Sequence, residues 1–242
     1  MTNRYTDSSE HVFLAIDNRR VVRAACRGDE WQVEIVLDGS SPVTLATDPN
    51  RPEVVCAGTQ GNGVYRSTDR GRSWSHLGLV GKVVKSIAVS PHDSSVIYAG
   101  VKPAAVFKST DGGDHWVELA GFRRVRNRWW WFSPAEPPFQ AYVNGLAVSP
   151  DEPDVVLAGI ELGALVRSAD GCRTWSPHLR GAIRDCHWLR FHNGDGRWVY
   201  EAGGTGGGAA VSRDGGRTWR QPKAGLARKY GVACAADPAA GP

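Results

Sequence analysis

The sequence lacks several features that would point to particular classes of protein. It contains a single methionine among 242 residues, and it has no apolar run of the roughly 18 residues that a membrane-spanning helix requires. Its first residues, MTNRYTDSSEHVFLAIDNRR, lack the apolar core of a secretory signal peptide. We therefore expect no membrane partner and a cytoplasmic location.

Cysteine is also scarce and irregularly placed. The five cysteines are odd in number, and no two of them have the C-x-x-C spacing that is typical of zinc sites and redox motifs. Without an export signal, they are expected to be reduced thiols. The sequence therefore predicts neither a disulfide framework nor a bound metal or cofactor.

The excess of positive charge is too small to indicate a nucleic-acid partner. Lysine and arginine number 29 against 25 acidic residues, so the net charge is +4. The hydrophobic content of 41% is ordinary for a globular protein, while 29 glycines and 10 tryptophans indicate many turns and strands. We predict a single domain over residues 1–242.

What the sequence does contain is a repeat. Four octapeptides share a serine, an aspartate two residues later and a final tryptophan, with glycine at the fifth position in three of them: STDRGRSW (67–74), STDGGDHW (109–116), SADGCRTW (168–175) and SRDGGRTW (212–219). An apolar stretch ends in a glycine nine residues before each serine, at Gly58, Gly100, Gly159 and Gly203. A pattern repeated in register over this length predicts a repeated structural unit.

Each unit is expected to be a meander of four short strands, as in SIAVSP, SVIYAG, AAVFKSTD and DHWVELAG. The aspartate lies in the turn between the third and fourth strands, where its carboxylate can accept backbone N–H bonds. One such meander cannot bury both of its faces, but several arranged radially can. The repeat therefore predicts an all-β fold, a β-propeller of four-stranded antiparallel blades.

The octapeptides resemble the Asp-box, S-x-D-x-G-x-x-W, also called the bacterial neuraminidase repeat. This motif is shared by sialidases, xyloglucanases, sortilin-type receptors and photosystem II assembly factors. The resemblance covers nearly the whole chain, and it implies the propeller fold much more specifically than any function. It also implies that the repeat residues are structural and not catalytic, namely Ser67, Asp69, Gly71, Trp74, Ser109, Asp111, Gly113, Trp116, Ser168, Asp170, Trp175, Ser212, Asp214, Gly216 and Trp219.

About five blades are predicted, at approximately residues 11–38, 43–78, 84–120, 144–180 and 186–222. The first contains a decayed repeat, AACRGDEW (24–31), in which Cys26 replaces the aspartate, so this unit is expected to hold only the second to fourth strands. Two architectures are open. Residues 230–238 could pair with the strand near Val12–Ile16 and close a five-bladed ring, or the chain forms part of a larger ring. Because the Asp-box propellers that it resembles have six to ten blades, we favour the larger ring.

A loop insertion at residues 121–143 lengthens the connection between the second and third repeats. It contains RRVRNRWWWFSPAEPPF (123–139) and joins the outermost strand of one blade to the channel-lining strand of the next. Such a connection lies opposite the Asp-boxes, at the mouth of the channel. We predict a recognition loop, with a self-packed lid as the alternative. Its ligand-binding candidates are Arg124, Arg126, Arg128, Trp129, Trp130 and Trp131.

The same register places further polar residues on this face. Asp185 and His187 are two apart, so they point the same way on a strand and could form an acid–base or binding group with Glu161; a solvated ion pair is the alternative. Glu201 falls in the slot of Cys56, Tyr98 and Leu157 or, if the strand is bulged, in that of Ala57, Ala99 and Ala158. The catalytic candidates are Asp185, His187, Glu161 and Glu201, and the further ligand-binding candidates are Tyr142, Asn144, Arg184 and Tyr230.

Two functions are compatible with these residues. A glycoside hydrolase would need two carboxylates on either side of one bond, for example Asp185 with Glu161 or Glu201. The sialidase F/Y-R-I-P motif is absent, however, and the xyloglucanases that the sequence resembles are much longer. We favour a non-enzymatic binding or scaffold propeller that holds an unknown protein, or a small anionic or sugar-like ligand, on its Trp/Arg-rich face.

Overall fold

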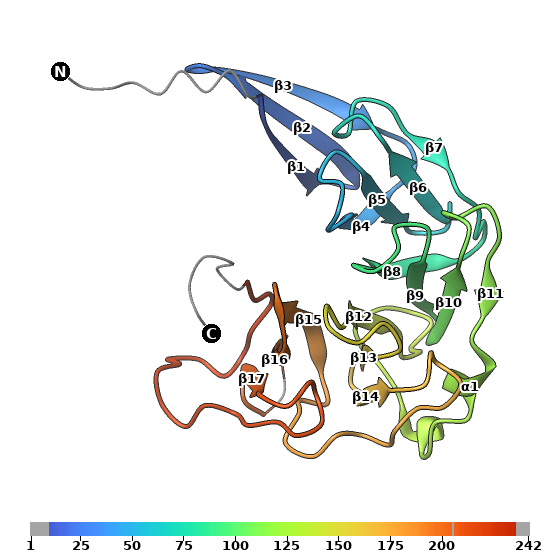
Figure 1. Ribbon diagram of the computed structural model, residues 1–242, viewed down its shortest axis with the longest axis vertical. Coiled ribbons are helices and arrows are strands. Elements are labelled where there is room, and N and C mark those ends of the chain that lie inside the picture. Colours follow the sequence, from blue (N-terminus) through green and yellow to red (C-terminus); the bar gives the residue numbers. More distant parts are fainter. Residues whose placement is uncertain (1–9, 205, 236–242) are drawn as a thin grey trace.

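Five antiparallel sheets follow one another along the chain in the computed structural model, which describes residues 10–204 and 206–235. Figure 1 shows them arranged in an open arc, with the first sheet at one end and the last at the other. The first sheet consists of β1 (His11–Asp17), β2 (Arg20–Arg27) and β3 (Glu30–Leu37). Between the third and fourth sheets lie α1 (Ala120–Arg123) and one 3-10 turn (Arg128–Trp130).

The other four sheets have the strand order expected for a meander. The second consists of β4 (Pro42–Thr47), β5 (Val55–Thr59), β6 (Val64–Ser67) and β7 (Ser75–His76). The third consists of β8 (Val83–Val89), β9 (Ile97–Lys102), β10 (Ala105–Ser109) and β11 (Val117–Glu118). The fourth consists of β12 (Val143–Val148), β13 (Val156–Ile160) and β14 (Leu165–Ser168). The fifth consists of β15 (Cys186–His192), β16 (Asp195–Gly203) and β17 (Ala209–Ser212).

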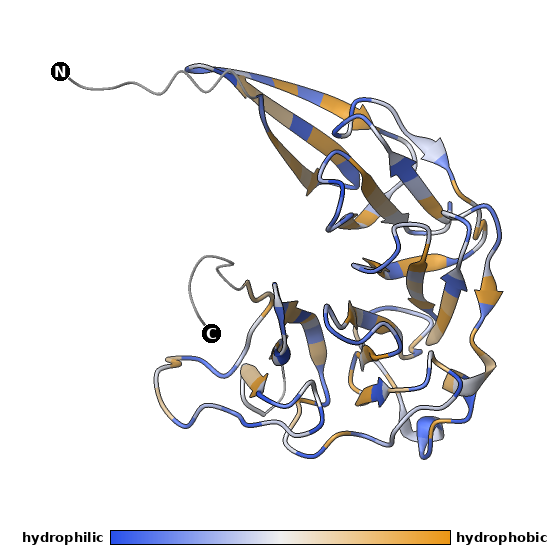
Figure 2. Cartoon of the chain, viewed as in Figure 1, coloured by the Kyte–Doolittle hydropathy of each residue, from blue (hydrophilic) through white to orange (hydrophobic). Residues whose placement is uncertain are grey.

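The core lies between neighbouring sheets, because each sheet packs one face against the next. Figure 2 shows apolar and polar residues alternating along β2 and β3, the pattern of strands whose two faces differ. The first strands β4, β8, β12 and β15 contact one another in turn along the inner side of the arc. The repeat glycines allow this approach. A Cβ on Gly58 would lie 2.7 Å from the Val84 side chain, and one on Gly159 would lie 2.2 Å from the Cys186 sulfur.

The four octapeptides form turns with the same hydrogen bonds. In the first, the Ser67 hydroxyl accepts the N–H of Gly71 at 2.8 Å, and Asp69 accepts the N–H of Ser73 at 2.9 Å. In the third, Cys172 stands where the others have glycine, adopts a φ of 71° and still donates its N–H to Ser168. The hydroxyl and amide of Thr174 lower the pKa of Asp170 to about 2, so this carboxylate is ionised at neutral pH. The repeated aspartates therefore act as acceptors for the turn amides.

Not every sheet has the four strands that the sequence predicts. The second and third sheets do, whereas the fourth and fifth have three strands each. In the fifth, the fourth strand is reduced to an isolated bridge between Val211 and Arg220. Pro177 and Pro222 follow the repeat tryptophans closely in these two units, and proline cannot donate the N–H that would continue a ladder.

The first sheet departs from the repeat. The prediction that residues 24–31 form a decayed copy of the repeat turn is wrong. Residues 27 and 30 instead pair directly across a two-residue turn. Cys26 has no carboxylate to collect turn amides, and its thiol instead donates to the carbonyl of Gly28. Trp31, in the position of a repeat tryptophan, is 52% exposed, whereas Trp219 is buried.

Pairing between the two ends of the arc is not seen in the residues that the structure describes. β1 pairs with β2, and the segment proposed for closure has no strand through Ala235; residues 236–238 lie outside the described part. Gly231 instead donates its N–H to Gly203 in the last sheet, at 2.8 Å. Within 10–204 and 206–235, neither helix is long or apolar enough to cross a bilayer.

The repeat turns generate a prediction about stability. Ser67→Ala leaves the buried N–H of Gly71 without its acceptor, so we expect the free energy of unfolding to fall by about 1–3 kcal/mol. Urea denaturation measures this loss. The matched control is Ser73→Ala in the same turn, where the exposed hydroxyl bonds only to Asp69. Equal losses in the two variants would contradict a structural role for the buried serine.

Candidate functional site

The loop at 121–143 lies on the side of the sheets opposite the repeat turns. Arg128 donates a hydrogen bond to the carbonyl of Ala104, in the β9–β10 turn. A Cβ on Gly163, in the β13–β14 turn, would lie 3.1 Å from the Trp131 ring. Lys102 donates to the carbonyl of Glu136 at 2.8 Å. Because these contacts all involve the turns between second and third strands, the loop covers the face that the sequence predicts.

One part of the loop is anchored in the core. The Trp131 ring lies 5.6 Å from the ring of Phe122, which is fully buried. The Arg128 guanidinium lies 5.8 Å from the centroids of both of these rings. These three side chains hold the loop against the third and fourth sheets, so Trp131 and Arg128 serve as anchors and not as free binding groups.

The other part of the loop is exposed. Trp129 and Trp130 are 75% and 69% exposed, and their rings stack on each other with centroids 4.3 Å apart. Arg124 and Arg126 are exposed too, and neither forms an ion pair with another described residue. Phe132 and Phe139 add two more exposed rings. The loop therefore presents an apolar and cationic surface on an anchored base.

A second group of residues gathers beside this loop. Glu161 follows β13 directly, while Asp185 and His187 lie at the start of β15. The His187 Nε2 atom is 3.6 Å from a Glu161 carboxylate oxygen and 3.5 Å from an Asp185 carboxylate oxygen. Desolvation and the Asp185 carboxylate raise the pKa of Glu161, although His187 and a hydrogen bond from Tyr142 lower it in part. Glu161, Asp185 and His187, here called the mouth triad, converge as the sequence suggested.

Lysines and aromatic rings surround the mouth triad. Tyr142 is buried, and the ammonium group of Lys85 lies 4.9 Å from the centroid of its ring. Lys85 is paired with Glu136 of the aromatic loop at 2.5 Å. Tyr230 is largely exposed, and its ring centroid lies 5.1 Å from that of His187. The loop is therefore connected to the mouth triad through Tyr142, which hydrogen-bonds to Glu161, and through the Lys85–Glu136 ion pair beside the Tyr142 ring.

Two other ligand-binding candidates have backbone partners. Asn144 donates to the carbonyl of Cys186 at 3.4 Å, and Arg184 donates to the carbonyl of Gly163 at 3.1 Å. The first bond links the fourth sheet to β15 of the fifth, and the second links it to the segment just before β15. Their contacts support packing of the two sheets, with the exposed Arg184 remaining on the surface.

Glu201 does not join the mouth triad. It is only 1% exposed, and its carboxylate accepts the N–H of Ile183 at 2.8 Å. In the sheet, Glu201 pairs with Leu189 in the same way as Ala57 pairs with Leu45. The glycine-rich turn after β16 is one residue longer than the corresponding turn after β5, and this shifts Glu201 by one position. The shifted register is therefore the correct one of the two alternatives, and Glu201 occupies an alanine slot in the core.

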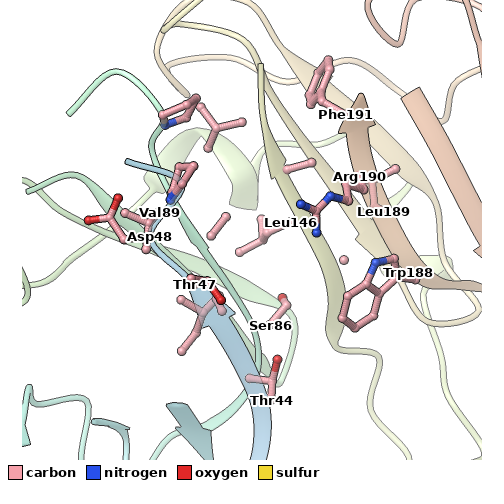
Figure 3. Close-up of a pocket in the computed structure, with 18 of the residues that line it drawn as sticks. Thr44, Thr47, Asp48, Ser86, Val89, Leu146, Trp188, Leu189, Arg190 and Phe191 are labelled. Carbon is pink, nitrogen blue, oxygen red and sulfur yellow. The ribbon is translucent and has the colours of Figure 1, made fainter. Parts of the chain in front are cut away.

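A cleft of about 460 Å³ runs along the inner side of the arc, between β4, β8, β12 and β15. Figure 3 shows Trp188 and Arg190 on β15 and Thr44 and Ser86 on the facing strands that line it. Trp188 and Arg190 are not among the binding residues that the sequence predicts. The sequence feature that could have identified them is the alternation of side-chain directions along β15, in which the intervening Leu189 is buried.

The five sheets define a nearly all-β chain of propeller type, and comparisons with known proteins agree with this class. No protein-family model and no curated protein matches the sequence. Among solved structures, an ancestral GH74 enzyme is similar, with 20% identity and a TM-score of 0.56 over 75% of this chain. This chain spans only 24% of that enzyme's chain.

Two further structures are similar at lower scores. The GH74 xyloglucanase from Xanthomonas campestris is 18% identical, with a TM-score of 0.46, and the match covers 86% of this chain and 44% of the enzyme. YCF48 bound to D1 peptide is 17% identical, with a TM-score of 0.48, and the match covers 90% of this chain and 79% of YCF48. At such identities the likeness concerns the fold alone.

The position of Glu201 generates a prediction about pH. Burial raises its pKa from 4.5 to about 8, so the folded protein keeps a proton that the unfolded chain releases above pH 4.5. The contribution of this group to stability therefore falls as the pH rises from 4.5 to about 8, and it is constant above that range. In Glu201→Gln, stability relative to the original chain should rise across this window by at most about 1.4 kcal/mol per pH unit.

Urea denaturation at several pH values between 5 and 9 measures this difference. Glu30→Gln, an exposed glutamate in the first sheet, is the control and should show no such slope. A difference between Glu201→Gln and the original chain that does not change with pH would show that the Glu201 pKa is not raised.

Proposed function

We propose that the chain is part of an Asp-box β-propeller and that its five sheets are blades. The support for this proposal is the common hydrogen bonding of the four octapeptide turns, in which a serine hydroxyl and an aspartate carboxylate collect the turn amides. The open arc in Figure 1 agrees with a larger ring better than with closure at five blades. The propeller supplies a scaffold, and its function depends on the face opposite these turns.

The function that the geometry supports best is non-enzymatic binding of an anionic partner on this face. The observation that carries it is the stacked pair of Trp129 and Trp130, held in the open by a loop in which the next residue, Trp131, packs against the buried Phe122. Large rings exposed in this way are rare on a surface that contacts only water. Tryptophan and arginine are also the residues that most often dominate binding energy at interfaces.

The charges beside the tryptophans indicate the kind of partner. Arg124 and Arg126 are exposed cations, and the described residues supply no carboxylate to pair with them. Arg123, by contrast, is neutralised by Glu118. An acidic peptide segment or an anionic oligosaccharide could stack on the rings and pair with the two free guanidinium groups. Because the loop is anchored before binding, little ordering entropy is lost on association.

The glycosidase alternative receives less support from the geometry. One oxygen of Glu161 and one of Asp185 lie within 4.8 Å of each other, which is too close for the wide separation of the two carboxyl groups in inverting enzymes. Glu161 and Asp185 are also buried, which leaves little room for a sugar between them. The remaining carboxylate candidate, Glu201, lies in the core.

The binding proposal predicts that Trp129→Ala combined with Trp130→Ala weakens binding at least tenfold, equivalent to about 1.4 kcal/mol, and leaves the fold intact. Biolayer interferometry of the immobilised protein would measure this with four probes. These are a glutamate-rich peptide, a neutral peptide of the same length, a sialylated oligosaccharide and its neutral counterpart. Binding should be confined to the anionic probes, because the neutral ones cannot pair with Arg124 and Arg126.

Two variants serve as controls. Trp31→Ala removes another exposed tryptophan, on the first sheet, and should leave binding unchanged. Trp131→Ala removes the anchor and should lower the free energy of unfolding, whereas the double variant should not. Absence of binding to both anionic probes, or equal binding by the double variant and the original chain, would refute this function.

A further inference from the structure

We propose that the mouth triad binds one zinc ion, with His187 Nε2 and one carboxylate oxygen each from Glu161 and Asp185 as ligands. The sequence suggested that these three residues meet, but it gave no sign of a metal, because they have no metal-ligand motif spacing. In the structure, their donor atoms all lie within 4.8 Å of one another. This inference goes beyond the proposed binding of a partner, and it involves none of the loop tryptophans.

The orientation of His187 is the first observation in favour of a metal. Its Nδ1 atom lies 2.8 Å from the carbonyl oxygen of Gly231, which can only accept a hydrogen bond. Nδ1 must therefore carry the proton, and in the neutral ring the lone pair of Nε2 points toward the two carboxylates. Metal-binding histidines are held in this way in most proteins, with the second ring nitrogen donating to a carbonyl or carboxylate.

The state of Glu161 is the second, independent observation. Its side chain is nearly buried, since the residue is 8% exposed, and its Oε2 atom has no hydrogen-bond partner among the described residues. The same atom is the one that faces His187 Nε2, at 3.6 Å. A buried carboxylate oxygen without a hydrogen bond is costly, and a cation between it and the imidazole would offset this cost.

The donor types and their spacing favour zinc over magnesium or calcium. Zinc accepts imidazole and carboxylate ligands at about 2.0–2.2 Å in a tetrahedron, which places neighbouring donor atoms roughly 3.3–3.5 Å apart. The separations of 3.5 and 3.6 Å from Nε2 are close to this value, and the two carboxylate oxygens lie within 4.8 Å of each other. Magnesium requires near-octahedral oxygen ligands, which lie closer together, and calcium takes six to eight oxygens.

The two lysines near the triad both contact Glu136 of the loop. Lys85 is paired with Glu136 at 2.5 Å, and Lys102 donates to the carbonyl of the same residue. Three protein ligands also leave one coordination position for water or for an oxygen of an incoming ligand, as in zinc sites that remain open. The exposed Tyr230 ring beside His187 marks the side from which such a group would enter.

The test uses the full chain, freed of metal with a chelator and titrated with zinc in competition with a chromophoric indicator. We expect one zinc ion per chain. His187→Gln and Glu161→Gln should each weaken its binding at least a hundredfold, because each removes one of three ligands. His115→Gln is the matched control. His115 also lies beside a carboxylate, that of Asp111 at 2.7 Å, but on the exposed surface, and its loss should leave the affinity unchanged.

Circular dichroism of each variant checks that it is folded. If a triad variant fails to fold, the proposal is tested instead by the visible absorption of the original chain loaded with Co²⁺. Intense visible absorption, which is typical of tetrahedral cobalt, would support the site. The proposal is overturned by weak octahedral absorption, by the absence of a stoichiometric zinc site, or by equal zinc affinities in the folded triad variants and His115→Gln. Loss of zinc binding would leave recognition by Trp129 and Trp130 to be judged by its own probes.

Discussion

The close approach of neighbouring sheets is the constraint on which the rest of the structure depends. At Gly58, Gly100 and Gly159 the first strand of the next sheet lies so near that a Cβ would be 2.2–2.8 Å from its side-chain atoms. None of these three glycines has a positive φ, so their role is to make room and not to bend the backbone. Because the inner strands can meet here, the apolar faces of successive sheets are buried against each other, and the two ends of every strand form two separate faces of the arc.

These two faces use polar residues differently. On one face, the serine and aspartate of each octapeptide accept hydrogen bonds from the amides of their own turn. The carboxylates are therefore already hydrogen-bonded within the turn. On the other, the turns are short and the long connection at 121–143 covers two of them, anchored by Trp131 and Arg128. The second face therefore keeps side chains whose charges and rings are not used by the backbone, and these are the groups available for binding.

The mouth triad and Glu201 illustrate how position decides the chemistry of a carboxylate. Glu161 and Asp185 lie at strand ends beside an imidazole, where negative charges can be shared with a histidine or a cation. Glu201, on the neighbouring strand β16, occupies a slot that other sheets fill with alanine, and desolvation keeps it protonated up to about pH 8. The first pair is suited to holding a charged ligand, whereas Glu201 is a neutral hydrogen-bonding group of the core.

The sequence by itself determined the repeated unit, the strands of the complete units and the face on which the aromatic loop lies. These follow from local chemistry: period-two alternation, turn residues at fixed offsets, and the place of an insertion between two strands. It also indicated the meeting of Glu161, Asp185 and His187, because register on neighbouring units carries that information. Only the tertiary structure decided the rest. Trp131 packs against Phe122 and Gly163 and is partly buried, whereas Trp129 stays exposed. The register of Glu201 depends on one additional residue in a glycine-rich turn, and the tautomer of His187 depends on a carbonyl 44 residues away. The exposure of the loop tryptophans, the register of Glu201 and the tautomer of His187 all depend on contacts between segments distant in the sequence. No local sequence pattern predicts such contacts.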